Sequence, residues 1–357
     1  RWSGSKTYHQ RTDRSCAGLM KVESFGHLQT GQEAHVYTIE NDVLQVQISD
    51  YGATIVAIYD KVLQRHLALG YDSVQDYETK HGQLGATVGR VANRIANAAY
   101  TWNGKEHVLT PNNGPNLLHS GSGNIGHRIW TLVDTESTDT SLCLAHRISS
   151  YEDGFPGDLQ VKALFTVQHN QLHVTYKYYT TEDSFVNLTN HVYINLHGQG
   201  DLTNHVLQLG STHFMPFGEH QIPLETPKSV EGTPFDFRGG LDVQQALEQY
   251  EIELRPYRGY DHDFVVAPLV ETTDTIVPFA EVRGRDMALT MYTDAPHVQV
   301  YTGNWLDETG RDRHYGTHSG IAIEPQFVPN DINTIGASKT KAHHHYERHI
   351  MYVFDHI

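Results

Sequence analysis

Short runs of alternating apolar and polar residues are the strongest constraint on how this chain can fold. In the run 172–179, Leu172, Val174, Tyr176 and Tyr178 alternate with His173, Thr175, Lys177 and Tyr179. Because successive side chains of a strand point to opposite faces, this period of two predicts a half-buried β-strand. Related strand-like runs occupy 36–39, 43–48, 53–59 and 160–167, and turn residues separate them. The pattern predicts an all-β, antiparallel fold, either a large sandwich or a jelly-roll-like barrel.

Helical periodicity is scarce by comparison. The sequence predicts one helix over 241–251 and a turn near 73–77, without the regular alternation of strands and helices that a doubly wound parallel sheet requires. Asn103-Gly104 and Asn113-Gly114 predict tight turns. No Pro/Ser-rich linker interrupts the chain, so residues 20–357 are predicted to form a single domain. Residues 1–19 are polar, basic and non-periodic, and are interpreted as a leader or an appended extension.

The charge balance excludes several classes of function. The chain has 26 basic and 42 acidic residues and a formal net charge of −16. Such a chain lacks the basic face that nucleic acids require, and it favours a neutral ligand over a highly phosphorylated one or an anionic membrane. No apolar run approaches the roughly 18 residues that a membrane-spanning helix needs. Two cysteines provide neither a disulfide framework nor a cysteine zinc site, and a cytoplasmic location is expected.

Two motifs suggest ligand sites that their surroundings do not support. The string Gly121-Ser122-Gly123-Asn124-Ile125-Gly126 matches GxGxxG, but a strand-like segment follows it where a dinucleotide site needs a helix. We interpret it as a glycine-rich loop beside a pocket. The histidines at 314, 318 and 343–345 lack convergent metal-ligand spacing, so surface positions and no metal are predicted.

Four other segments concentrate polar residues among turn residues between predicted strands. They are 85–95, 112–121, 187–196 and 321–330, and they contain Arg90, His119, His191 and Glu324. Such groups are costly to place at strand ends unless they are paired or used. Glu324 follows Ile321-Ala322-Ile323, which predicts partial burial and a raised pKa, as suits a general base. Each residue alone could equally have a structural role.

Together these segments resemble the aldose 1-epimerase (galactose mutarotase) family, whose patterns include GxxxGRxANRI, NNGxNxLHGG and NxTNHxYxNL and a late ExQxxPDxxN. Further agreement lies in 154–159, 233–238, 259–262 and 299–304, in family order. The resemblance implies a large antiparallel β-sandwich of the galactose mutarotase-like supersandwich type. It also implies a mutarotase that interconverts the α and β anomers of free aldohexoses such as galactose and glucose, without a cofactor.

The resemblance also assigns roles to individual residues. His191 matches the catalytic acid and Glu324 the catalytic base, while Arg90, His119, Asp261 and Asn93 match sugar-binding positions. Phe279 is a further candidate, for covering an apolar face of the sugar. We expect a small-molecule monosaccharide substrate, no nucleic acid or membrane partner, and a monomer or homodimer. The alternatives are an epimerase of phosphorylated hexoses and a sugar-binding protein without activity on the same scaffold.

Overall fold

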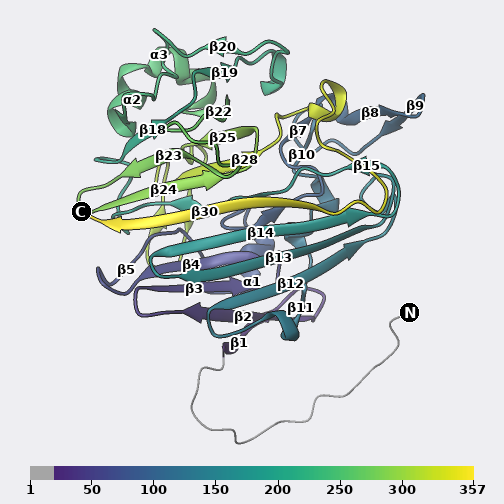
Figure 1. The fold of residues 1–357 in the computed structure, drawn as a ribbon, viewed down its shortest axis with the longest axis horizontal. Helices are drawn as coiled ribbons and strands as arrows, with labels where there is room; N and C mark the ends of the chain where they lie inside the picture. The colour runs from purple at the N-terminus through teal and green to yellow at the C-terminus, as the bar shows by residue number, and fades with distance from the viewer. Residues whose placement is uncertain (1–19) are drawn as a thin grey trace, which may run out of the picture.

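The computed structural model describes residues 20–357, and the expectation for residues 1–19 lies outside them. Two layers of antiparallel strands pack face to face, as Figure 1 shows. The first layer is one nine-stranded sheet, in the order β11 (Thr131–Leu132), β12 (Ser141–Ile148), β13 (Leu159–Gln168), β14 (Gln171–Thr180), β30 (Tyr346–His356), β24 (Met287–Thr293), β23 (Val277–Arg283), β18 (Val206–Leu209) and β21 (Leu241–Asp242).

The second layer consists of two sheets joined by a bridge between Ala68 and Ile194. One is five-stranded and contains β1 (Lys21–His27), β2 (Glu33–Glu40), β3 (Leu44–Ser49), β4 (Thr54–Asp60) and β5 (Arg65–His66). The other is six-stranded, in the order β17 (Tyr193–Ile194), β28 (Ile321–Gln326), β25 (His297–Tyr301), β22 (Asp261–Val265), β19 (His213–Met215) and β20 (Lys228–Ser229).

Short elements connect the sheets. In the described part of the chain, five strand pairs lie outside the three sheets: β6 (Thr87–Val88) with β16 (Thr189–Asn190), β7 (Arg94–Ile95) with β10 (Leu117–Leu118), β8 (Ala99–Trp102) with β9 (Lys105–Val108), β15 (Ser184–Phe185) with β29 (Lys339–Thr340), and β26 (Glu308–Thr309) with β27 (His314–Tyr315). The helices are α1 (Val74–Thr79), α2 (Val243–Gln249) and α3 (Glu251–Leu254), with 3₁₀ turns η1 (Ala96–Ala98), η2 (Gly121–Gly123), η3 (Ile125–His127), η4 (Asp134–Glu136), η5 (Glu219–Gln221), η6 (Arg255–Tyr257) and η7 (Asp331–Asn333). Among the described residues, no helix is long and apolar enough to cross a membrane.

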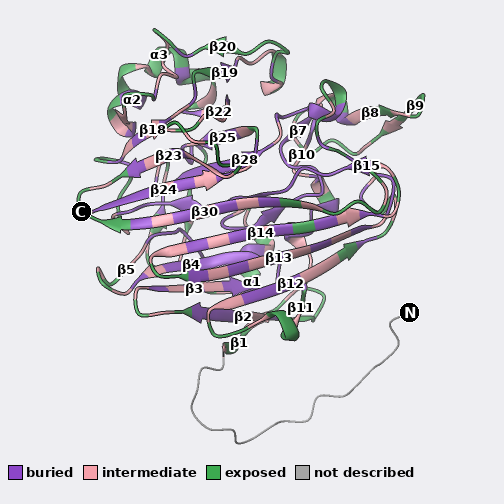
Figure 2. Ribbon diagram, viewed as in Figure 1, coloured by how far each residue is buried: buried purple, intermediate pink, exposed green. Residues whose placement is uncertain are grey.

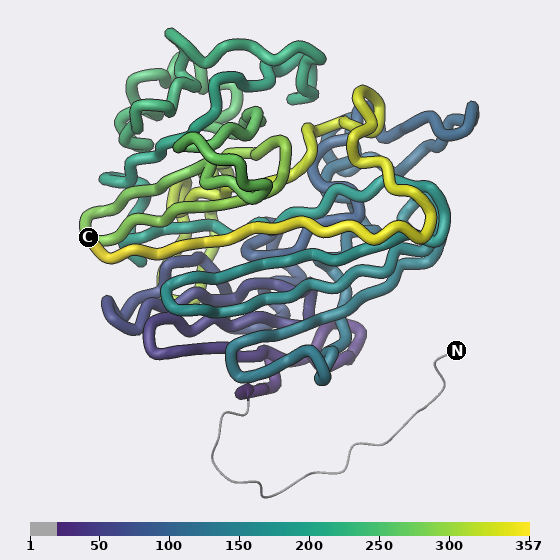
Figure 3. Tube along the Cα trace, viewed as in Figure 1, coloured from purple at the N-terminus to yellow at the C-terminus, as the bar shows by residue number. Residues whose placement is uncertain are grey.

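The layers are held together by side chains on alternate strand positions. Strand β14 buries Leu172, Val174, Tyr176 and Tyr178, as its period of two predicts, and Figure 2 shows buried residues alternating with more exposed ones along this sheet. One apolar core joins these residues to inward side chains of both sheets of the second layer. The last strand, β30, lies between β14 and β24, so the C-terminal segment (yellow in Figure 3) connects the two halves of the large sheet.

The all-β, antiparallel prediction is therefore confirmed. Each predicted strand-like run falls inside an observed strand or extends at most one residue beyond it. Asn103-Gly104 forms the turn between β8 and β9, with both residues at positive φ. The predicted helix over 241–251 begins later, because Leu241 and Asp242 pair with β18 and the Asp242 side chain caps α2. The predicted turn near 73–77 is a short helix, α1, capped by Ser73.

Candidate active site

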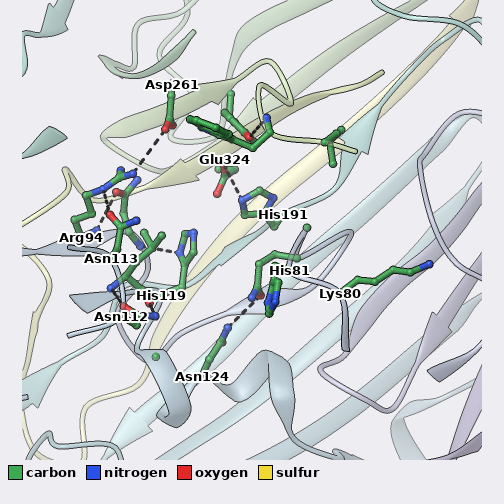
Figure 4. Close-up of a pocket in the computed structure, with 18 of the residues that line it drawn as sticks. Lys80, His81, Arg94, Asn112, Asn113, His119, Asn124, His191, Asp261 and Glu324 are labelled. Atoms are coloured by element: carbon green, nitrogen blue, oxygen red, sulfur yellow. Dashed lines mark hydrogen bonds and ion pairs between the residues drawn. The ribbon is translucent and has the colours of Figure 1, made fainter. Parts of the chain in front are cut away.

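A cleft of about 1040 Å³ opens beside the six-stranded sheet, and Figure 4 shows the side chains that line it. Polar groups from well-separated segments meet here, since β22, β25 and β28 supply one wall and the loops around β7, β10 and β17 supply another. His191, Glu324, His119, Asn93 and Asp261 all line it, so five of the six predicted site residues come together.

His191 and Glu324 form the centre of this group. His191 Nε2 lies 3.5 Å from Glu324 Oε1, and the two side chains are 7% and 2% exposed. In Figure 4 they point toward each other, and a dashed line marks the contact between them. Neither His191 Nδ1 nor Glu324 Oε2 has a hydrogen-bond partner within the described chain. Since buried polar atoms are normally satisfied, two unpaired atoms in one buried pair are unusual for a purely structural contact.

The backbone fixes both residues in place. Glu324 is on β28, the second strand of the six-stranded sheet, where Ile321 and Ile323 point into the main core, so the alternation turns Glu324 to the opposite face. His191 lies between β16 and β17. Its backbone N–H donates to the Ala86 carbonyl, and its own carbonyl accepts from the Gly85 N–H, both at 2.9 Å.

Burial shifts the pKa values of the pair in opposite directions. It lowers the pKa of His191 to about 4. It raises the pKa of Glu324 well above the ordinary value, an effect that the charge of Asp261 increases and Arg94 partly offsets. The burial and raised pKa expected of Glu324 are thus both present. The carboxyl holds a proton more strongly than usual and the imidazole more weakly, as suits a pair that exchanges protons.

Asn93 holds His119 in one tautomer. The Asn93 backbone N–H donates to His119 Nδ1 at 3.1 Å, and the His119 backbone N–H donates to the Asn93 carbonyl at 3.0 Å. Burial lowers the pKa of His119 well below its ordinary value, and the nearby His191 adds to the effect. A neutral ring that accepts at Nδ1 carries its hydrogen on Nε2, so Nε2 of His119 can donate a hydrogen bond to a ligand.

Asp261 belongs to a network that the sequence did not predict. Its carboxylate accepts from Gln299 Nε2 at 2.8 Å and from Gln221 Nε2 at 3.1 Å. Arg94 Nη2 lies 3.8 Å from the same carboxylate and donates to Gln221 Oε1 at 3.0 Å. Gln299 is paired across the sheet with Glu324, which links the network to the central pair. The cleft therefore presents fixed donors and acceptors, as recognition of several hydroxyl groups requires.

The structure corrects the prediction for Arg90, which does not line the cleft. Its guanidinium is fully buried, with Nε 2.7 Å from Asp153 Oδ2, and it donates to the carbonyls of Pro156 and Gly157. This is a structural ion pair. Phe279 is also corrected, because it is fully buried in the main core.

Sequence reasoning missed two residues, Arg94 and Gln299. Arg94 is in the same GRxANR string as Arg90, and the string alone does not show which arginine faces the ligand. Gln299 could have been found from strand parity, because alternate residues on β25 share a face and its neighbour Tyr301 also lines the cleft.

The glycine-rich loop at 121–126 contributes Gly121, Ser122 and Asn124 to the cleft, as predicted. Its residues form the 3₁₀ turn η2 and the start of η3. Within residues 20–357, no group of three or more His, Cys, Asp or Glu side chains is placed to hold a metal ion. His343, His344 and His345 are exposed, which confirms their predicted surface position.

Comparison with known proteins agrees with this geometry. The profile of the aldose 1-epimerase family matches residues 35–352, so the chain belongs to that family. It is 35% identical to a galactose mutarotase of Bos taurus over 320 residues, covering 87% of this chain and 90% of that one. It is 34% identical to an aldose 1-epimerase of Escherichia coli (strain K12) over 313 residues, covering 85% and 89%.

Two solved structures share the fold. The GalM/aldose epimerase homologue of C. elegans superimposes with a TM-score of 0.82 at 29% identity, covering 91% of this chain and 99% of that one. The galactose 1-epimerase of Lactobacillus acidophilus NCFM gives a TM-score of 0.84 at 25% identity, covering 95% and 99%. The supersandwich architecture is thereby confirmed.

Proposed function

We propose that this protein is an aldose 1-epimerase, an isomerase that interconverts the α and β anomers of free aldohexoses such as galactose and glucose. The observation that carries the proposal is the buried His191–Glu324 pair, with 3.5 Å between Nε2 and Oε1, in a polar cleft. Family membership and relatives named galactose mutarotase and aldose 1-epimerase support the same activity.

The chemistry needs one base and one acid close together. Opening an aldose ring removes a proton from the anomeric hydroxyl, O1, and adds one to the ring oxygen, O5. Both oxygens are bonded to C1, so two groups as close as His191 and Glu324 can serve both at once. Glu324 takes the O1 proton while His191 protonates O5, and each contributes roughly 10²–10⁴-fold. The open aldehyde rotates about C1–C2 and closes on its other face, with the two residues exchanging roles.

The pair must carry one proton in total throughout this cycle. Burial supports that state. It lowers the pKa of His191 to about 4, which disfavours protonation of both residues at once, and it raises the pKa of Glu324, which disfavours loss of the proton from both. The proton can lie on either residue, so the titration belongs to the pair. Asp261, Arg94, Gln299 and the His119–Asn93 unit hold the sugar by its hydroxyls while C1 reacts.

The charge of the cleft favours a neutral sugar over a phosphorylated one. Its lysine and arginine side chains are Lys80 and Arg94, and each has a carboxylate neighbour, at 3.1 Å for Asp76 and 3.8 Å for Asp261. A phosphate dianion would compete with both. The overall charge of −16 acts in the same direction.

Polarimetry of freshly dissolved α-galactose and α-glucose tests the proposal. The expected result is acceleration in proportion to enzyme concentration, with a smaller effect on glucose 6-phosphate. No acceleration of either free sugar would refute the proposal and favour a binding protein, while a preference for the phosphorylated sugar would favour the other epimerase. A cytoplasmic location and a monomer or homodimer remain part of the proposal. Cell fractionation and light scattering test them.

A further inference from the structure

The loop of residues 310–319 contains basic side chains that the proposed reaction does not use. It follows β26 and leads into β28, the strand of Glu324. Its two arginines, Arg311 and Arg313, lie outside the catalytic cleft. The chain as a whole has a net charge of −16, so buried cationic groups without matching carboxylates require a physical reason.

Arg313 buries part of its guanidinium without a carboxylate partner. Nη1 donates to Ser319 Oγ at 3.4 Å, and Cζ lies 5.1 Å from the centre of the Tyr315 ring. Nε and Nη2 are buried, and neither has a hydrogen-bond acceptor within residues 20–357. Because a charged group removed from water is costly unless it is paired, these two N–H groups suit an anionic ligand.

A small cavity adjoins Arg313. Its wall also includes His66, Ala68 and Tyr315. The cavity lies at the junction of the two sheets of the second layer, because Ala68 forms the bridge to Ile194 there. Its volume of about 10 Å³ is enough for one atom or molecule of the size of water.

His66 contributes a second unpaired donor. Its Nδ1 is buried and has no hydrogen-bond partner in the described chain. Burial lowers the pKa of His66, and the charge of Arg311 adds to this effect. Asp312 and Asp72 oppose the effect only in part, so the ring is neutral at neutral pH. A neutral imidazole with its hydrogen on Nδ1 donates one hydrogen bond, so Arg313 and His66 together provide three N–H groups and one positive charge.

The nearby carboxylates do not neutralise this charge. Asp312 lines the cavity but is exposed to solvent, and its Oδ1 lies 3.5 Å from the Tyr315 hydroxyl. The Asp72 side chain is 70% exposed and lies 3.7 Å from Arg311 Nε, while Arg311 Nη1 is buried without a partner among the described residues. Water screens exposed carboxylates, so the field at the buried donors stays positive.

Charge and size together identify the ligand. The donors require an acceptor with negative charge, since a water molecule would satisfy the N–H groups but not the charge of the guanidinium. The volume excludes phosphate, sulfate and carboxylates, which have several heavy atoms. Chloride is a single atom slightly larger than a water molecule, and its weak hydration suits a cavity with an apolar wall at Ala68 and Leu69.

We propose that this cavity binds one chloride ion, held by Arg313 and His66, and that the ion fixes residues 310–319 against the strands of the second layer. Asn195 Nδ2 donates to the Ser319 carbonyl at 2.9 Å, and β17 pairs with β28. The ion therefore stabilises the framework that holds the catalytic pair. The inference does not depend on the proposed function, because its tests measure ion binding and stability.

Thermal denaturation in sodium chloride and in sodium methanesulfonate, at equal ionic strength, tests the site. An ion present at about ten times its Kd should raise the Tm of the wild type by roughly 1–3 °C. Arg313→Gln should remove this difference between the salts. The matched control is Arg283→Gln, at an arginine whose side chain is 51% exposed and paired with Glu281, and it should keep the difference.

Bromide locates the ion without any variant. Wild-type crystals soaked in sodium bromide should show an anomalous peak in the cavity, in contact with Arg313 and His66, and this result decides the question if Arg313→Gln does not fold. Equal Tm values in the two salts, a chloride effect that survives in Arg313→Gln, or a cavity without a bromide peak would each overturn the inference. A stabilisation by phosphate that Arg313→Gln also removes would contradict the assignment to a monatomic anion.

Discussion

Arg90 and Arg94 are four residues apart, and the structure gives them opposite roles. Replacing each with Met keeps a side chain of similar length and removes the charge. Arg90→Met leaves Asp153 buried without its partner at 2.7 Å. Burial already raises the pKa of Asp153 and the charge of Arg90 opposes this rise, so the carboxylate loses its main stabilising contact. Breaking such a pair costs about 3–5 kcal/mol, which for a domain of this length is a fall in Tm of roughly 4–7 °C.

Arg94→Met has a different expected result. Its guanidinium is 8% exposed, lines the cleft and contacts Asn113, Gln221 and Asp261. Loss of one charged hydrogen bond to the sugar costs about 1.5–3 kcal/mol, which lowers kcat/KM roughly 10- to 150-fold. The fall in Tm should be smaller than for Arg90→Met, because Arg94 leaves neighbours that reach water.

Polarimetric kinetics and thermal denaturation of the same preparations separate the two effects. Arg90→Met with Asp153→Asn is the control, and it should recover most of the stability lost by Arg90→Met alone, since no buried charge remains. The reasoning would be refuted if Arg94→Met were fully active, or if Arg90→Met kept its stability and lost only sugar binding.

Three further predictions follow from the cleft. Glu324→Gln should raise Tm, and the gain should grow with pH above the pKa of an unfolded glutamate, because a carboxyl whose folded pKa is raised costs about 1.4 kcal/mol of stability per pH unit until it ionises in the fold. A pH-independent difference would contradict this. The value of kcat/KM should fall on the acidic side below about pH 4, where both His191 and Glu324 are protonated. It should fall again on the alkaline side, above the raised pKa of Glu324. An acidic midpoint near the ordinary pKa of histidine would contradict the assignment. Gln299→Leu should raise KM about tenfold, because Asp261 loses the hydrogen bond that holds it. The control is Gln326→Leu, at a buried position outside the cleft, which should leave KM unchanged. Equal KM values for the two variants would show that Gln299 is not part of the site.

The sequence predicts the strands well because their alternation is a local property. The run 172–179 and strand β14 agree to one residue at each end, since burial of alternate side chains requires that period. Which strands pair is less accessible. Strand β30 pairs with β24 on one side and with β14 on the other, and more than 100 residues separate β14 from β30 in the sequence. No local pattern in the sequence predicts such a pairing.

The site residues also differ in whether local sequence or the folded structure is needed to identify them. Resemblance to a family located His191 and Glu324, and burial of Glu324 followed from the apolar residues before it. The sequence could not distinguish Arg90 from Arg94, because the difference depends on Asp153, a partner more than 60 residues away that buries one guanidinium. Gln299 was missed because its role depends on cross-strand register with Glu324, which only the folded sheet defines.

The central claim is that His191 and Glu324 together move the two protons of ring opening. The most direct test is the rate of α-galactose mutarotation by His191→Ala and Glu324→Gln, measured by polarimetry on variants shown to be folded. The account predicts that each variant loses roughly 10²–10⁴-fold, and that the double variant loses little more than the worse single one. A folded variant of either residue that retains a near-normal rate would contradict it.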